Sequence, residues 1–184
     1  MIRVAILTAA AAVSTAAWAQ SSEVGQRAEN QQDRIAQGAK SGSLTAGETG
    51  NLETKESAIN QEVRTDRTLN GGHLTGQEKK IVNQQQNQMS RQIYADKHNA
   101  AVQKYGNDKV DARRENQQDR IANGIASGKL NAAQTAHLEK GESSINKEVH
   151  ADRSANGGKL TPAERQQVNH PQNRMSRKIY RAKH

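Results

Sequence analysis

The chain has 184 residues and a formal net charge of +8 at pH 7, and 33% of its residues are hydrophobic. It contains no Cys, no Phe and a single Trp, which excludes disulfide and thiolate chemistry and argues against a large aromatic core. The composition favours long amphipathic helices with narrow apolar faces, and partial disorder is the alternative.

Residues 1–19 have the features of a secretory signal peptide. Arg3 precedes an apolar run, and Ala17-Trp18-Ala19 forms a small-residue cleavage site. The alternative is an uncleaved membrane anchor, for which the run is short. We therefore expect an exported protein, periplasmic or extracellular, that is not an integral membrane protein after cleavage.

The rest of the chain is an internal repeat. The sequence of residues 29–36 recurs at 115–122, and the offset of 86 residues holds without a gap to the end of the chain. A repeat of this kind is read as two copies of one structural unit. We therefore divide the chain into module 1, residues 20–106, and module 2, residues 107–184.

Four helix-start signals set the expected helix boundaries. In each, a Thr or Asn that follows a Leu is followed three residues later by Glu or Gln, the pattern of a capping box. The pairs are Thr45 with Glu48, Thr75 with Glu78, Asn131 with Gln134, and Thr161 with Glu164. Glycines before the caps mark the preceding helix ends. The predicted helices are 22–41, 46–70, 76–97, 109–127, 132–156 and 162–182.

Apolar residues within these helices recur at steps of four and seven, which place them on one narrow stripe. Polar residues such as Lys55, Glu56 and Gln85 interrupt the stripe. The pattern predicts an all-α fold, a duplicated three-helix module of antiparallel amphipathic helices that pair as hairpins with coiled-coil-like seams. Pro171 lies inside the last predicted helix, so we expect a bend near residues 169–171 or a frayed end.

Positive charge is concentrated in module 2. Residues 20–106 carry 11 basic and 10 acidic residues, whereas residues 107–184 carry 15 and 9. Clustered basic side chains attract anionic polymers, although a solubilising tail is the alternative. The candidate polyanion contacts near the end of the chain are Arg174, Arg177, Lys178, Arg181 and Lys183.

Metal, cofactor and catalytic signals are weak. Residues 66–78 and 152–164 approach a calcium loop but are one residue out of register, and a glycine turn followed by a capping box explains the same residues. No two histidines have the i, i+4 spacing of a helical metal site. We predict no cofactor, no metal ligands and no catalytic residues, and thus no enzyme; a metal- or calcium-binding module is retained as the second alternative function.

Two equivalent tyrosines, Tyr94 and Tyr180, follow an Ile near the end of a predicted helix in each module. The favoured interpretation is that each closes the end of a helical seam. The alternative is that each stacks on a base or sugar beside neighbouring basic residues.

The Leu-Thr-x-x-Glu boxes at residues 44–48, 74–78 and 160–164, with the weaker box at 130–134, resemble the LTxxQ signature of the Spy/CpxP family of periplasmic helical proteins. Three of the four boxes end in Glu, and no Met- or His-rich N-terminal segment is present. The resemblance implies an all-α periplasmic protein, dimeric in that family, that acts as an ATP-independent chaperone or envelope-stress factor.

These observations order the candidate functions. The first is an exported helical interaction protein whose partners are unfolded or envelope proteins. The alternative is a surface protein that binds an anionic polymer (polysaccharide, lipopolysaccharide or nucleic acid) through module 2. The sequence leaves homo-oligomerisation open.

Overall fold

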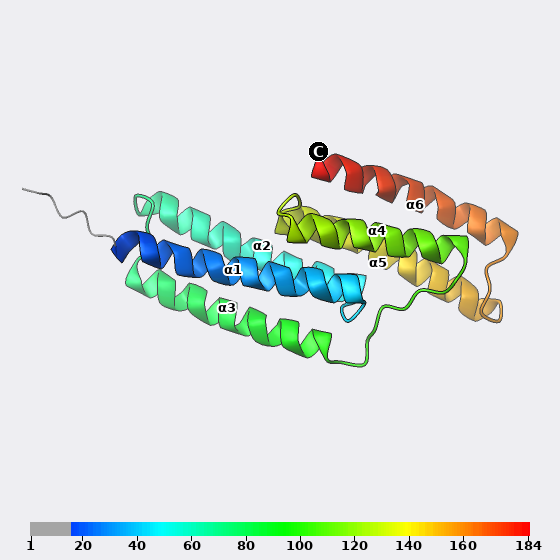
Figure 1. Cartoon of the computed structure of the whole chain (residues 1–184), viewed down its shortest axis with the longest axis horizontal. Coiled ribbons are helices and arrows are strands. Elements are labelled where there is room, and N and C mark those ends of the chain that lie inside the picture. Colours follow the sequence, from blue (N-terminus) through cyan, green and yellow to red (C-terminus); the bar gives the residue numbers. More distant parts are fainter. Residues whose placement is uncertain (1–15) are drawn as a thin grey trace, which may run out of the picture.

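The computed structural model describes residues 16–184, and within them it contains six α-helices and no strand (Figure 1). The predicted all-α class is therefore confirmed. The helices are α1 (Ala16–Ser41), α2 (Ala46–Leu69), α3 (Gly76–Lys97), α4 (Lys109–Ala126), α5 (Ala132–Ala155) and α6 (Pro162–Lys183). The bounds of α2 and α3 lie 86 residues before those of α5 and α6, in agreement with the offset of the sequence repeat.

The predicted signal peptide lies largely outside the described residues, because only its last four positions fall within α1. None of the described helices is long and apolar enough to cross a membrane.

Side-chain caps determine where the helices begin. At α2 the Thr45 hydroxyl accepts from the Glu48 backbone N–H at 3.3 Å, and the Glu48 carboxylate accepts from the Thr45 N–H at 2.9 Å. The same reciprocal pair starts α3, α5 and α6. At α4, the Asp108 carboxylate accepts from the N–H groups of Val110 and Asp111. Each cap satisfies backbone donors that the helix leaves unpaired.

The two sets of three helices lie end to end and overlap in the middle of the molecule (Figure 1). In the overlap α2 packs mainly against α5, and α1 against α4, while α3 and α6 cover the outer faces of their own sets. A Cβ atom placed on Gly50 of α2 would lie 3.3 Å from the Cβ of Glu139 on α5. The missing side chain therefore lets the two helices approach closely at the junction.

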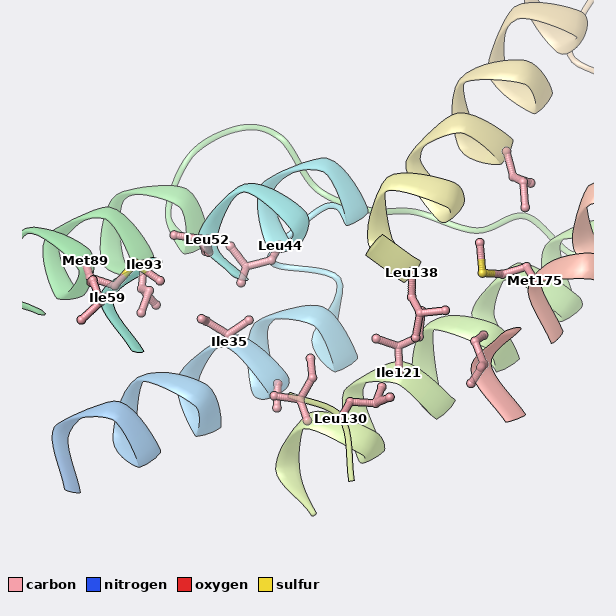
Figure 2. Close-up of a cluster of buried hydrophobic side chains, with 14 of the residues drawn as sticks. Ile35, Leu44, Leu52, Ile59, Met89, Ile93, Ile121, Leu130, Leu138 and Met175 are labelled. Atoms are coloured by element: carbon pink, nitrogen blue, oxygen red, sulfur yellow. The ribbon is translucent and has the colours of Figure 1, made fainter. Parts of the chain in front are cut away.

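Apolar side chains form one cluster that runs through both sets of helices, and part of it is shown in Figure 2. Buried glutamines supplement this thin core. Gln31 donates to the Gln86 carbonyl at 2.7 Å, and Gln86 donates to the Val24 carbonyl at 2.9 Å. Gln117 and Gln172 repeat the arrangement in module 2. These bonds join α1 to α3 and α4 to α6 where apolar residues are few.

The end of α6 does not fray, since the helix continues through Pro171 to Lys183. The bend expected near residues 169–171 stays a prediction. Val168 and Met175 are buried on either side of the proline, and Gln172 bonds to α4 in both directions. These contacts hold the helix in place despite the missing backbone hydrogen bond.

Replacing Pro171 by glutamine, the residue at the equivalent position 85, is expected to raise the free energy of unfolding by about 2–3 kcal/mol. The substitution restores a backbone donor, and the new side chain can reach Glu148 as Gln85 reaches Glu62, at 2.7 Å. Urea denaturation followed by circular dichroism measures the change. The reverse substitution, Q85P, should destabilise the protein by a similar amount, and an unchanged P171Q variant would contradict the argument.

Candidate binding grooves

Groove 1 lies between α2 and α3 and has a volume of about 640 Å³. Ile59 and Met89 form its apolar floor, although each is almost fully buried. Lys55, Glu62 and Arg91 bring charge to its edges. The remaining lining residues are small or polar, namely Ala58, Gln85, Gln88, Gln92 and Ala95.

Groove 2 lies between α5 and α6 and has a volume of about 660 Å³. Its floor is Ile145 and Met175, which stand 86 residues after Ile59 and Met89. Arg174 and Lys178 replace Gln88 and Gln92 on the α6 side of groove 2, whereas Gly141 replaces Lys55 on the α5 side. The same apolar floor is thus present twice, and the second copy has more positive charge along α6.

Four of the five predicted polyanion contacts are exposed on α6. Arg174, Arg177, Lys178 and Arg181 follow one another at steps of three, one and three, so they share one face of the helix. Lys183 differs, because it is partly buried and its Nζ donates to the Arg120 carbonyl at 3.0 Å. Lys183 therefore joins the end of α6 to α4, and the exposed basic face consists of the other four residues.

The residues that resembled a calcium loop have other partners. The Glu78 carboxylate accepts from the Thr75 backbone and, at 2.9 Å, from the Asn70 side chain. Gly71 and Gly72 have positive φ angles of 64° and 95°, so they form the turn. Across residues 16–184 no group of three or more His, Asp or Glu side chains is arranged to hold a metal ion.

The favoured interpretation of the tyrosines is wrong. Tyr94 and Tyr180 are 62% and 59% exposed. They stack on His98 and His184 with ring centroids 4.1 and 4.4 Å apart. Each tyrosine precedes its histidine by one helical turn, at the C-terminal end of the helix, and its ring lies outside the apolar core.

A cluster of four buried glutamates at the junction is the feature that the sequence analysis missed. Glu53 and Glu56 of α2 and their equivalents Glu139 and Glu142 of α5 are each at most 1% exposed. Glu53 accepts from the Gln32 side chain at 3.0 Å, and Glu139 accepts from Gln118 at 2.6 Å. One oxygen of each carboxyl has no hydrogen-bond partner among the described residues. We name these four residues the glutamate cluster.

Burial dominates the electrostatics of the glutamate cluster. It raises the pKa of Glu53 and of Glu142 to about 8 and that of Glu56 to about 7, and it raises the pKa of Glu139 well above its ordinary value. The neighbouring Glu53 and Glu142 carboxyls raise the pKa of Glu139 further. Near neutral pH, where a solvated glutamate is ionised, Glu53, Glu139 and Glu142 therefore remain largely protonated and Glu56 remains partly protonated.

Glu56, one of the polar residues that interrupt the apolar stripe in the sequence, is buried. Thr49, Gly50, Glu53 and Glu56 are all buried, and they form a second face of α2 that packs toward α5. The repeat of Thr-x-x-x-Glu-x-x-Glu at Thr135, Glu139 and Glu142 was the available signal, because polar residues at helical spacing can define an interface as well as a solvated face.

Comparison with known proteins adds no relative, since no family model, no curated protein and no solved structure matches this chain.

Proposed function

We propose that the protein is an exported helical interaction protein that holds segments of unfolded or envelope proteins in grooves 1 and 2, as an ATP-independent chaperone. The observation that carries the proposal is the recurrence of an Ile–Met floor between charged edges in both modules. Methionine suits such a floor because its flexible side chain adapts to different apolar partners. The resemblance to the Spy/CpxP family supports the same assignment.

The occupant that fits best is an apolar segment with acidic flanks. Groove 2 has two cationic side chains, Arg174 and Lys178, against the single carboxylate of Glu148. Groove 1 has Lys55 and Arg91 against Glu62. A segment with acidic residues on either side of its apolar residues would therefore match both the floors and the edges.

The test is light scattering from a protein that aggregates on reduction, with and without an equimolar amount of this protein. The A58E/S144E variant puts a carboxylate into each groove at an exposed helical position, and it is expected to lose most of the suppression. The N51E/H137E variant is the matched control, since its two positions are exposed, equivalent in the repeat and outside both grooves. Equal suppression by both variants would contradict the proposal, as would no suppression by the wild type.

A second candidate function is the binding of an anionic polymer by α6, and its exposed basic face favours it. Binding of this kind weakens steeply as salt rises, because cationic side chains displace counterions from the polymer. Substituting Arg174, Arg177, Lys178 and Arg181 by glutamine should abolish binding to heparin at about 50 mM salt. Retained binding would exclude α6 as the contact surface.

A further inference from the structure

The segment between α3 and α4 is attached to both modules. The Gln103 N–H donates to the Gly42 carbonyl at 2.8 Å, and the Gln103 side chain accepts from Asn146 of α5 at 3.0 Å. Gly42 has a φ of +73°, and a Cβ atom on it would collide with the Gln103 carbonyl oxygen. These contacts bring the connecting segment between the start of α2 and the side of α5.

A cavity of about 560 Å³ opens at this place, and we name it the junction cavity. It lies between the start of α2, the connecting segment, α4 and α5. All of its charged lining residues are basic, and no carboxylate lines it. The basic residues are Lys104, Arg114 and Lys147, with His150 beside them. A smaller cavity of about 300 Å³ shares Lys104, Arg114 and His150.

Arg114 is the fixed member of this set, because only 5% of it is exposed. Its Nε donates to Asn146 at 2.7 Å and its Nη1 to Asp111 at 2.9 Å, and its guanidinium lies 5.1 Å from the centre of the Tyr105 ring. These bonds fix the orientation of the guanidinium, and Arg114 lines the junction cavity. A buried, oriented guanidinium is a strong anion contact, because it loses little freedom on binding.

Asp111 balances the charge of Arg114 in the junction cavity, whereas the charges of the two lysines are not cancelled by ion pairs. Asp111 accepts from both Arg114 and Arg153, and Asp108 accepts from Arg153, so two aspartates are balanced by two arginines. Lys104 and Lys147 are exposed and have no ion pair within the described part of the chain. A net positive potential therefore remains at the mouth of the cavity.

The repeat shows that this charge is not a requirement of the helical scaffold. Position 28 of module 1, equivalent to Arg114, is Ala, and position 61, equivalent to Lys147, is Gln. The helices of module 1 fold without either cation. The basic lining of the junction cavity is thus a property of module 2 and the connecting segment alone.

We propose that the junction cavity binds a small organic polyanion with two or more carboxylate or phosphate groups. Arg114 would hold one anionic group, and Lys104 of the connecting segment and Lys147 of α5 would hold the others. A volume of about 560 Å³ suits a compact metabolite. The site differs from the exposed basic face of α6 in its residues and in the size of its ligand, so it stands whether or not the grooves bind proteins.

Isothermal titration calorimetry on the purified protein tests the proposal, with citrate as the carboxylate probe and pyrophosphate as the phosphate probe. Saturable binding of at least one probe is expected, and K104Q/K147Q should weaken it by about tenfold or more. K147Q also recreates the glutamine of module 1. The probe that binds more tightly identifies the chemical source of the ligand.

The K80Q/K129Q variant is the control, since it removes the same charge from two exposed lysines outside the junction cavity and outside both grooves. It should leave the affinity unchanged. If both double variants bind the probe equally weakly, the loss of affinity follows from net charge alone, and the proposal is overturned. No saturable binding, or binding that is lost only when the four basic residues of α6 are replaced, would overturn it as well.

Discussion

The E53Q/E139Q variant is expected to unfold at a temperature roughly 5–10 °C above that of the wild type at pH 8. Glutamine keeps the shape of a protonated glutamate and the oxygen that accepts from Gln32 or Gln118, but it cannot ionise. The wild type must either keep these buried carboxyls protonated or bury a charge. Both cost free energy, on the order of 1.4 kcal/mol for each unit by which a pKa is displaced.

The sign of the pH dependence follows from the raised pKa values. Unfolded glutamates lose their protons near pH 4.5, whereas Glu53 holds its proton to about pH 8 and Glu56 to about pH 7. Between these values the folded state binds more protons than the unfolded state, so the free energy of unfolding falls as the pH rises. Below pH 4.5 both states are protonated, and the effect disappears. The stabilisation in E53Q/E139Q should accordingly be large at pH 8 and small at pH 4.

Thermal melts at several pH values measure this effect. The control is E29Q/E115Q, which makes the same chemical change at equivalent exposed positions and should leave the melting temperature nearly unchanged. A wild-type melting temperature that does not fall between pH 5 and pH 8 would contradict the argument, because it would mean that the glutamate cluster is not protonated in the folded state.

Replacing Asp111 by alanine is expected to lower the free energy of unfolding by about 3–5 kcal/mol. Asp111 is 1% exposed and accepts from Arg114 at 2.9 Å and from Arg153 at 2.7 Å. Its loss leaves the Arg114 guanidinium buried without its carboxylate. Urea denaturation at pH 7 measures the loss. The D119A variant is the control, since it removes a partly exposed carboxylate from the same helix.

A second variant separates loss of the ion pair from loss of packing. D111L/R114M removes both buried charges, so it should be more stable than D111A. If D111A costs less than about 1 kcal/mol, or if D111L/R114M is no better, the ion pair is not what stabilises this end of α4.

Asp111 and the glutamate cluster have opposite effects on how the free energy of unfolding changes with pH. Burial acts to raise the pKa of Asp111, but the hydrogen bonds and charges of Arg153 and Arg114 outweigh it and hold that pKa below its ordinary value. Stability from Asp111 is therefore present above pH 3.8 and is lost as the pH falls further. The wild type should be most stable in mildly acidic solution, at roughly pH 4–6, between the two losses.

Helix positions could be predicted from the sequence because capping boxes and glycine turns are local signals. Thr45, Thr75, Asn131 and Thr161 each precede the first residue of a helix in the structure. A capping residue makes its bonds within three positions along the chain, so no knowledge of the tertiary fold was needed to find it.

The junction could not be predicted in the same way, because its chemistry depends on which helices meet. Glu53 and Glu56 have the same local sequence character as the exposed glutamates, and they are buried only because α5 covers them. The junction cavity likewise joins Lys104, Arg114 and Lys147 from three segments that no local pattern connects. The end of α6 does not fray at Pro171 for a related reason, since contacts with α4 override the local preference.

Glu53 and Glu139 face each other across the junction from equivalent positions of the repeat, which is the geometry of an isologous dimer. Equivalent helices of the two sequence repeats, α2 and α5, thus meet within one polypeptide. The contact between these helices does not depend on protein concentration, because the segment between α3 and α4 makes it intramolecular. Two tethered repeats can also diverge from each other, as Ala28 and Arg114 have, and a pair of identical chains cannot acquire such an asymmetric site on one side alone.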